Sequence, residues 1–351
     1  MHEAARRWGV DSDKVLDFSA NINPLGPPPG ILSAIENALT AGNLRAYPDV
    51  HAFLSAVVNK HRLIADEIVV GSGTASLIFA VMHALLPKRV LLLEPAFGEY
   101  ARACAAVNAE VVPWLLKEED GFAPDFATLV SELNERKFDL VILNSPHNPT
   151  GTLYPREALL SLIDAAERLG TVVVLDEAFG DYASQESLVS LTPAKPHLIV
   201  LRSLTKFYAM PGLRVGYAVC NSSLAQVMRR QIDPWSVSAI ALEAGRAALS
   251  EDDFGAESCR ANSTAREEFA AALRGLGLVV FPSSANFLLA KLPERSGEDL
   301  QDWLEPERIL IRKCVAFRGL GDAFIRLAVR TATDNMRLVS LIEKGLNRNK
   351  R

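Results

Sequence analysis

The stretch Leu198-Ile-Val-Leu-Arg-Ser-Leu-Thr-Lys206-Phe-Tyr-Ala-Met-Pro-Gly-Leu-Arg214 joins an apolar run to a polar turn. The run Leu198 to Leu201 is apolar on both faces, which is typical of a buried strand in a parallel sheet. Ligands of such sheets bind beyond the carboxyl ends of the strands. Lys206 follows such an end, where burial lowers the pKa of an amine and makes it a nucleophile for carbonyl groups. A lone lysine is more often a solvated surface residue, so this interpretation depends on its surroundings.

Similar short apolar runs alternate with helical stretches through the first two thirds of the chain. They cover residues 68–70, 90–93, 110–112, 140–143, 171–175, 198–201 and 213–219. This alternation predicts an α/β fold with a mainly parallel, seven-stranded sheet covered by helices on both faces. Beyond residue 234, helical patterns at 239–249 and 263–276 precede short strand-like runs at 278–281, 287–290, 309–311 and 324–329. This second pattern predicts a smaller α+β domain.

We therefore divide the chain into an N-terminal arm (1–30), a large domain (31–233) and a small domain (234–351). The arm ends in Asn23-Pro-Leu-Gly-Pro-Pro-Pro-Gly30, whose prolines favour an extended connector. Because the arm lies outside the parallel-sheet region, we expect it to pack with the small domain.

Composition excludes several classes of function. The 351 residues include 37 Lys and Arg against 42 Asp and Glu, a formal net charge of −5 that disfavours a nucleic-acid-binding protein. No apolar run reaches the roughly 18–20 residues that span a bilayer, and residues 1–10 lack the apolar core of a signal peptide. We expect a cytoplasmic protein. The cysteines and histidines show no metal-ligand spacing, so we expect no bound metal.

Polar turns follow three other predicted strands. Gly71-Ser-Gly-Thr-Ala-Ser76 opens a helix and directs backbone N–H groups at an anion, although such turns are mostly simple connections. Asn148 lies between two prolines in Asn144-Ser-Pro-His-Asn-Pro-Thr-Gly151. Asp176 begins Asp176-Glu-Ala-Phe179, where an acid is often only a helix cap. With Lys206, these turns supply the anion cradle, amide, carboxylate and amine that pyridoxal phosphate requires.

In their order and spacing, these turns resemble the motifs of the fold-type I, pyridoxal-phosphate-dependent aminotransferases of classes I and II. The resemblance covers nearly the whole chain. It implies that Lys206 binds the cofactor's aldehyde covalently, that Asp176 pairs with the ring nitrogen and that Asn148 bonds the phenolic oxygen. The other cofactor-binding residues that it implies are Gly73, Thr74, Ala75, Phe97, Ser203, Thr205, Arg214 and Tyr47.

Two of these assignments carry further implications. Phe97, in Pro95-Ala-Phe97, matches the aromatic residue that stacks on the cofactor ring. Tyr47, in Tyr47-Pro-Asp49, matches a tyrosine that reaches the cofactor phosphate from the other subunit. The resemblance therefore implies a homodimer with shared active sites.

The substrate-binding residues implied by the resemblance lie at the two ends of the chain. In Phe324-Ile-Arg-Leu-Ala-Val-Arg330, strand alternation places Arg326 and Arg330 on one face, a pattern that also fits surface arginines. The resemblance implies that Arg326 binds the substrate's carboxylate, that Arg312 is a second anion-binding arginine and that Asn23 contributes from the arm.

Two groups within the family stay open: histidinol-phosphate aminotransferases and L-threonine-O-3-phosphate decarboxylases of cobalamin biosynthesis. The segments 17–26 and 312–320 resemble the decarboxylases, and Phe179 replaces the tyrosine usual in the aminotransferases. The His-Gly-Gly-Asn segment that usually precedes a stretch like His2-Glu-Ala-Ala-Arg6 in the decarboxylases is absent from this sequence. We expect a small phosphorylated amino acid to lose CO2 here, yielding (R)-1-amino-2-propanol O-2-phosphate.

The residues alone do not decide between these reactions. In both of them the bond that breaks is the one held perpendicular to the cofactor ring, so the choice depends on how the substrate lies. A non-catalytic regulator built on this fold is a third alternative, but no DNA-binding module precedes Asn21.

Overall fold

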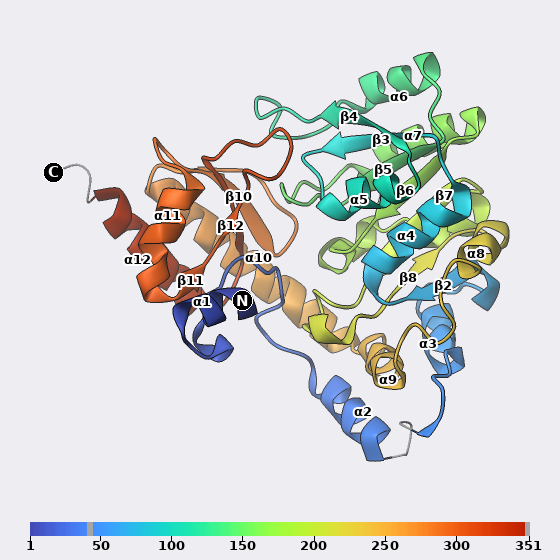
Figure 1. The fold of residues 1–351 in the computed structure, drawn as a ribbon, viewed down its shortest axis with the longest axis horizontal. Helices are drawn as coiled ribbons and strands as arrows, with labels where there is room; N and C mark the ends of the chain where they lie inside the picture. The colour runs from blue at the N-terminus through green and yellow to red at the C-terminus, as the bar shows by residue number, and fades with distance from the viewer. Residues whose placement is uncertain (41–44, 348–351) are drawn as a thin grey trace.

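A seven-stranded sheet forms the centre of the large domain in the computed structural model, which describes residues 1–40 and 45–347 (Figure 1). Its strands are β2 (Ile68–Gly71), β3 (Arg89–Glu94), β4 (Glu110–Leu115), β5 (Leu140–Asn144), β6 (Val172–Asp176), β7 (Leu198–Ser203) and β8 (Gly216–Val219). Their order is β2-β8-β7-β6-β5-β3-β4. Strands β3 to β7 pair in parallel, and β8 pairs antiparallel with β2 and β7. The predicted mainly parallel, seven-stranded sheet is confirmed.

Helices cover both faces of this sheet, which explains why its strands are apolar throughout. All residues of β5, β6 and β7 are buried. One face packs against α4 (Gly73–Leu85), α5 (Gly98–Ala106) and α8 (Ser222–Arg229). The other face packs against α3 (His51–His61), α6 (Phe126–Glu135), α7 (Arg156–Leu169) and α9 (Ala239–Ala248).

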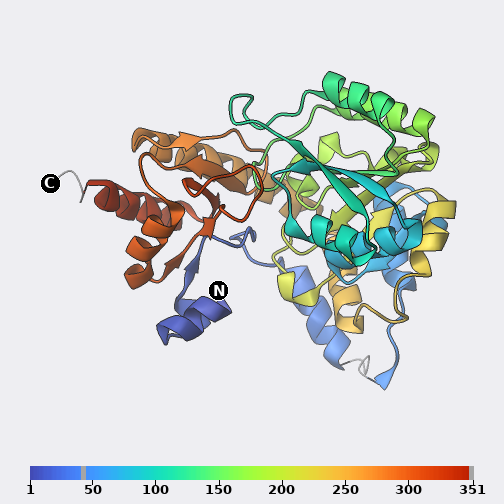
Figure 2. The ribbon, with the colours of Figure 1, turned by 45° about the horizontal axis from the view of Figure 1, so that its top comes forward.

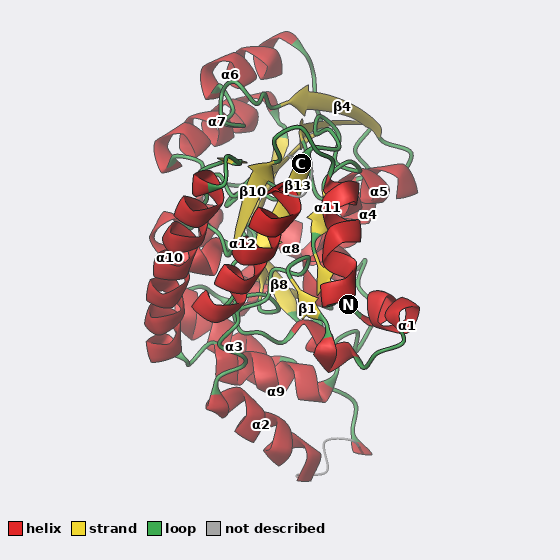
Figure 3. Cartoon of the chain, turned by 90° about the vertical axis from the view of Figure 1, so that its left-hand side faces the viewer, coloured by secondary structure: helices red, strands yellow, loops and turns green. Residues whose placement is uncertain are grey.

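The small domain is built on a four-stranded antiparallel sheet. Its order is β12 (Arg312–Lys313), β13 (Phe324–Ala328), β10 (Phe287–Lys291) and β9 (Val279–Val280). Three helices lie over this sheet in Figure 3: α10 (Asp252–Gly275), α11 (Gly297–Leu304) and α12 (Ala332–Asn347). No helix within residues 1–40 and 45–347 is long and apolar enough to cross a bilayer.

The N-terminal arm adds to the small domain before it crosses to the large one (Figure 2). After α1 (His2–Trp8), strand β1 (Leu16–Asp17) pairs in parallel with β11 (Ile309–Leu310). Phe18 is buried in the core of the small domain, with its ring centroid 6.1 Å from that of Phe269. The arm then leads into α2 (Pro29–Thr40), beside the large domain.

The predicted domain boundary between residues 233 and 234 is wrong, because helix α9 belongs to the large domain. It packs against α2 and α3, and its buried residues share the core of the large domain. Gly245 allows this close approach, because a Cβ there would lie 2.7 Å from the ring of Phe53. The change of domain therefore comes within α10, which begins at Asp252 rather than at Ser263 as expected.

Candidate active site

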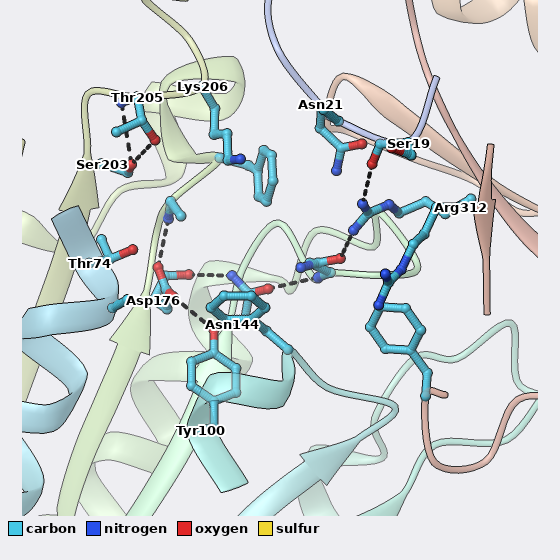
Figure 4. Close-up of a pocket in the computed structure, with 18 of the residues that line it drawn as sticks. Ser19, Asn21, Thr74, Tyr100, Asn144, Asp176, Ser203, Thr205, Lys206 and Arg312 are labelled. Atoms are coloured by element: carbon cyan, nitrogen blue, oxygen red, sulfur yellow. Dashed lines mark hydrogen bonds between the residues drawn. The ribbon is translucent and has the colours of Figure 1, made fainter. Parts of the chain in front are cut away.

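A cavity of about 450 Å³ opens at the carboxyl ends of β5, β6 and β7, where the two domains and the arm meet (Figure 4). Many of the residues predicted from the sequence line it. They are Thr74, Ala75, Phe97, Asn148, Asp176, Ser203, Thr205, Lys206, Arg214, Arg312 and Arg326. Residues distant in the sequence are therefore brought to one edge of the sheet, as expected for this kind of fold.

Lys206 lies in the wall of this cavity, just after β7. Burial, together with the charges of Arg326 and Arg214, lowers the pKa of its amine to about 8. The backbone N–H of Asn23, in the arm, donates to the carbonyl oxygen of Lys206 at 3.1 Å. A substantial fraction of the amine is therefore neutral just above neutral pH, as a nucleophile requires.

Asp176 ends β6 inside the cavity and is held by two donors. The hydroxyl of Tyr100 donates to Oδ2 at 2.8 Å, and the backbone N–H of Ala178 donates to Oδ1 at 2.9 Å. Burial raises the pKa of Asp176 to about 6, although both hydrogen bonds oppose this shift. The carboxylate is therefore mostly ionised at neutral pH and suits a cationic ring nitrogen.

A chain of hydrogen bonds runs from Asp176 across the cavity floor. The side-chain amide of Asn144 donates to the carbonyl oxygen of Asp176 at 2.6 Å, and the backbone N–H of Asn148 donates to Asn144 Oδ1 at 2.7 Å. The Arg326 guanidinium in turn donates to Asn148 Oδ1. This chain links the backbone of Asp176 to Arg326 and holds the side-chain oxygen of Asn148 against the arginine.

Sequence reasoning missed Tyr100 and Asn144 as members of the site. Tyr100 lies three residues after Phe97 and one turn into α5, so both rings reach the same cavity. Asn144 is the last residue of β5, and its position at a strand end was a usable signal.

A cradle for an anion forms where β2, β7 and β8 meet the start of α4. Thr74 and Ala75 lie in the first turn of α4, and the hydroxyls of Ser203 and Thr205 are 2.8 Å apart. Gly73 does not line the cavity, but Arg214 covers it closely: a Cβ there would lie 2.6 Å from the Arg214 guanidinium. Gly73 also has φ +77°, which a glycine adopts readily. Hydroxyl groups, N–H groups and a guanidinium therefore converge.

A second cationic region lies on the small domain. Arg312 and Arg326 are directly opposite each other on β12 and β13. Arg326 donates to the carbonyl oxygen of Ser19 at 2.9 Å, and its guanidinium lies 5.4 Å from the ring centroid of Phe287. Burial, together with the charge of Arg312, lowers the pKa of Arg326 to about 10. Two neighbouring guanidinium groups are well suited to an anion between them.

The arm presents Asn21 to the cavity rather than the predicted Asn23. The amide of Asn23 is used elsewhere, since it donates to the carbonyl oxygen of Phe207 and to Ser258 Oγ, both at 2.9 Å. Asn21 lines the cavity, and its buried Oδ1 has no hydrogen-bond partner within the described part of the chain. We therefore correct the assignment: Asn23 ties the arm to the lysine loop, and Asn21 faces the ligand space.

Tyr47 does not line the cavity of its own chain. Its side chain is 74% exposed, and its ring stacks on Trp235 with centroids 4.2 Å apart. A role at an active site would thus require a second copy of the chain.

These residues fit pyridoxal 5′-phosphate. The cradle beside Gly73 matches its phosphate, Asp176 its ring nitrogen and Lys206 its aldehyde, so the site is that of a pyridoxal-phosphate-dependent enzyme. The chain belongs to the family described as Aminotransferase class I and II, which matches residues 13–344. Enzymes of this family use pyridoxal 5′-phosphate.

Relatives with two different activities resemble this chain. A threonine-phosphate decarboxylase from Salmonella typhimurium is 39% identical over 351 residues, covering 99% of this chain and 95% of that protein. Among solved structures, the histidinol-phosphate aminotransferase of Clostridium acetobutylicum has a TM-score of 0.88 at 31% identity, covering 95% and 99% of the two chains. The L-threonine-O-3-phosphate decarboxylase of Porphyromonas gingivalis has a TM-score of 0.84 at 25% identity, covering 95% and 100%.

Proposed function

We propose that this chain decarboxylates L-threonine O-3-phosphate to (R)-1-amino-2-propanol O-2-phosphate and CO2, a step of cobalamin biosynthesis. The observation that carries the proposal is the presence of two anion sites in one cavity. Ser203, Thr205 and Thr74 lie on one side in Figure 4, Arg312 lies on the other, and Lys206 and Asp176 lie between them. One anion site suits the cofactor's phosphate, which leaves the arginine pair for a phosphate on the substrate.

The named residues divide the chemistry of such a reaction between them. When bound, the cofactor supplies an electron sink for the charge that develops at the substrate's Cα. Arg326 would bind a substrate carboxylate in the role that the resemblance implies. Here Arg312 and Arg326 bind the substrate phosphate instead, so the carboxylate is left without a guanidinium partner and is free to leave. Lys206, whose amine has a pKa of about 8, donates the proton that replaces CO2 at Cα.

Phe179 also favours decarboxylation over the alternative. Its ring is buried and packs edge-on against Phe287, with centroids 4.9 Å apart. The tyrosine that the resemblance associates with histidinol-phosphate aminotransferases would bring a hydroxyl to this position. That alternative, a histidinol-phosphate aminotransferase, is favoured by the likeness to the Clostridium acetobutylicum structure.

A paired substrate assay separates the two functions. With the cofactor-loaded protein and L-threonine O-3-phosphate, we expect one CO2 for each aminopropanol phosphate formed. With L-histidinol phosphate and 2-oxoglutarate, we expect no glutamate above the rate of a Lys206→Ala control. Steady formation of glutamate with no release of CO2 would overturn the proposal. Serine O-phosphate, which lacks one methyl group, should react with kcat/KM lower by about 10-fold to 100-fold.

We also propose that the active form is a homodimer in which Tyr47 completes the partner's site. Supporting this, Tyr47 and Trp235 form a stacked pair that is 74% and 57% exposed, and Leu32 and Leu39 of α2 are 49% and 47% exposed. Exposed apolar patches of this kind mark association surfaces.

The test is sedimentation of the purified protein together with a Tyr47→Phe variant. We expect the mass of two chains, each of 38.2 kDa, and a cofactor dissociation constant about 10-fold higher in Tyr47→Phe without a change in mass. Full activity in a species that sediments as a single chain would exclude shared sites.

A further inference from the structure

A loop of the large domain crosses to the small domain beside the arginine pair. It follows β4, and Figures 1 and 2 both show it extending from the large domain toward the small domain. Near its end lies Phe122, which is 1% exposed and has φ +59°. A bulky side chain seldom adopts this left-handed conformation, so the surrounding contacts must hold it there.

The ring of Phe122 is held by two rings of the small domain. Its centroid lies 4.9 Å from that of Phe281 and 5.9 Å from that of Phe324, both edge-on. At the rim of the same contact, both carboxylate oxygens of Glu118 lie 2.8 Å from Lys291 Nζ. Edge-on aromatic packing has a preferred geometry, so this contact fixes orientation as well as separation.

The same strand carries this contact and the guanidinium in the cavity. Phe324 and Arg326 are two residues apart on β13, so their side chains leave the same face of the sheet. Across the sheet they pair with Lys291 and Leu289 of β10. A shift of Phe324 relative to the large domain therefore moves Arg326 with it.

We propose that Phe122 is a positioning residue that sets the separation between Arg326 on the small domain and Lys206 on the large domain. A substrate whose phosphate is bound by Arg326 must reach Lys206 at the same time, so a change in the separation of these two residues weakens its binding. Arg326 also contacts Asn148 across the domains, but that contact lies inside the cavity, where the substrate competes for the guanidinium. Phe122 does not line the cavity, so its contact persists when the substrate binds.

The test compares Phe122→Leu with the matched control Phe126→Leu in the cofactor-loaded protein. Phe126 lies four residues further on, and the ring it contacts is that of Tyr154, within the large domain, at 5.6 Å. For Phe122→Leu we expect KM to rise about 10-fold with kcat changed less than about 2-fold. The dissociation constant of inorganic phosphate, used as a probe of the arginine pair, should change less than about 2-fold, because Arg312 and Arg326 both lie on the small domain and move together. Phe126→Leu should lower only the thermal midpoint.

Because the inference rests on the proposed function for the role of Arg326, KM is measured with whichever candidate substrate the unaltered protein turns over. A failed decarboxylation assay then leaves this test intact. A second variant, Lys291→Met, removes the ion pair with Glu118 at the rim and the cation that lies 5.3 Å from the ring centroid of Phe324, and it should raise KM about 2-fold to 3-fold. An unchanged KM in Phe122→Leu would overturn the inference, as would a phosphate dissociation constant that rises as much as KM, or equal changes in Phe122→Leu and Phe126→Leu.

Discussion

Replacing Lys206 with alanine is expected to remove both the activity and the covalently bound cofactor. The loss in kcat should be at least about 10⁴-fold, because one amine serves as nucleophile and as proton donor. The visible absorbance of the bound cofactor should disappear with it. The matched control is Lys137→Ala, whose side chain is exposed in the turn between α6 and β5 and which should retain both properties.

The pH dependence of cofactor attachment gives a second measurement on the same residue. Burial, with Arg326 and Arg214, lowers the pKa of Lys206 to about 8 from an ordinary value of 10.5. A lowered lysine pKa means that the reactive neutral amine appears above about pH 8 rather than above pH 10.5. The attachment rate of pyridoxal phosphate to the stripped protein should therefore rise through pH 8 and level off by about pH 9. A midpoint near 10.5, or absorbance that survives in Lys206→Ala, would show that the assignment is wrong.

The residues that sequence reasoning placed well share one property: each follows an apolar run. Asp176 is the last residue of β6, while Lys206 and Asn148 follow the ends of β7 and β5, and the carboxyl ends of parallel strands must meet at one edge. Local pattern and topology are enough to bring these three together. Their separation from one another depends on the strand order, in which β7, β6 and β5 are neighbours.

The arm was harder to predict, because its conformation depends on remote contacts. Asn21 and Asn23 lie two residues apart in an extended segment, and nothing in the sequence distinguishes them. The partners of Asn23 are Phe207, next to the lysine, and Ser258 on α10. These partners are distant in the sequence, so only the folded chain shows which asparagine faces the cavity.

The predicted position of the domain boundary was wrong for a related reason. The pattern of α9 correctly predicts a helix with one buried face. A helical pattern does not indicate which other element that face packs against. In the structure that surface is formed by α2 and α3, and Gly245 makes room for Phe53. A composition change near Asp233 was therefore a poor guide to where the small domain begins.

Replacing Arg326 with lysine is expected to lower kcat/KM by about 10²-fold to 10³-fold while the cofactor remains bound. Its guanidinium donates to Asn148 Oδ1 and to the Ser19 carbonyl oxygen and lies over the Phe287 ring. An ammonium group cannot reproduce this planar set of donors, and loss of a buried, charged hydrogen-bond partner costs about 2–5 kcal/mol. The loss in kcat/KM should come mainly from a higher KM, and the dissociation constant of phosphate should rise as well. Arg337→Lys, on the exposed side of α12, should match the unaltered protein.

The position of Arg312 makes a sharper version of this test possible. Arg312 lies directly opposite Arg326, so both guanidinium groups bind the same substrate phosphate if the proposal is right. Removing either group then weakens the binding that the other provides, and the two effects cannot add. Arg312→Met should raise KM about 10-fold in the unaltered protein but less than about 3-fold in the Arg326→Met background. Equal effects in both backgrounds would mean that the arginines bind different groups. The substrate phosphate would then need another partner. Asn21 Oδ1, which has no hydrogen-bond partner within residues 1–40 and 45–347, is an acceptor and would bind only a protonated phosphate oxygen.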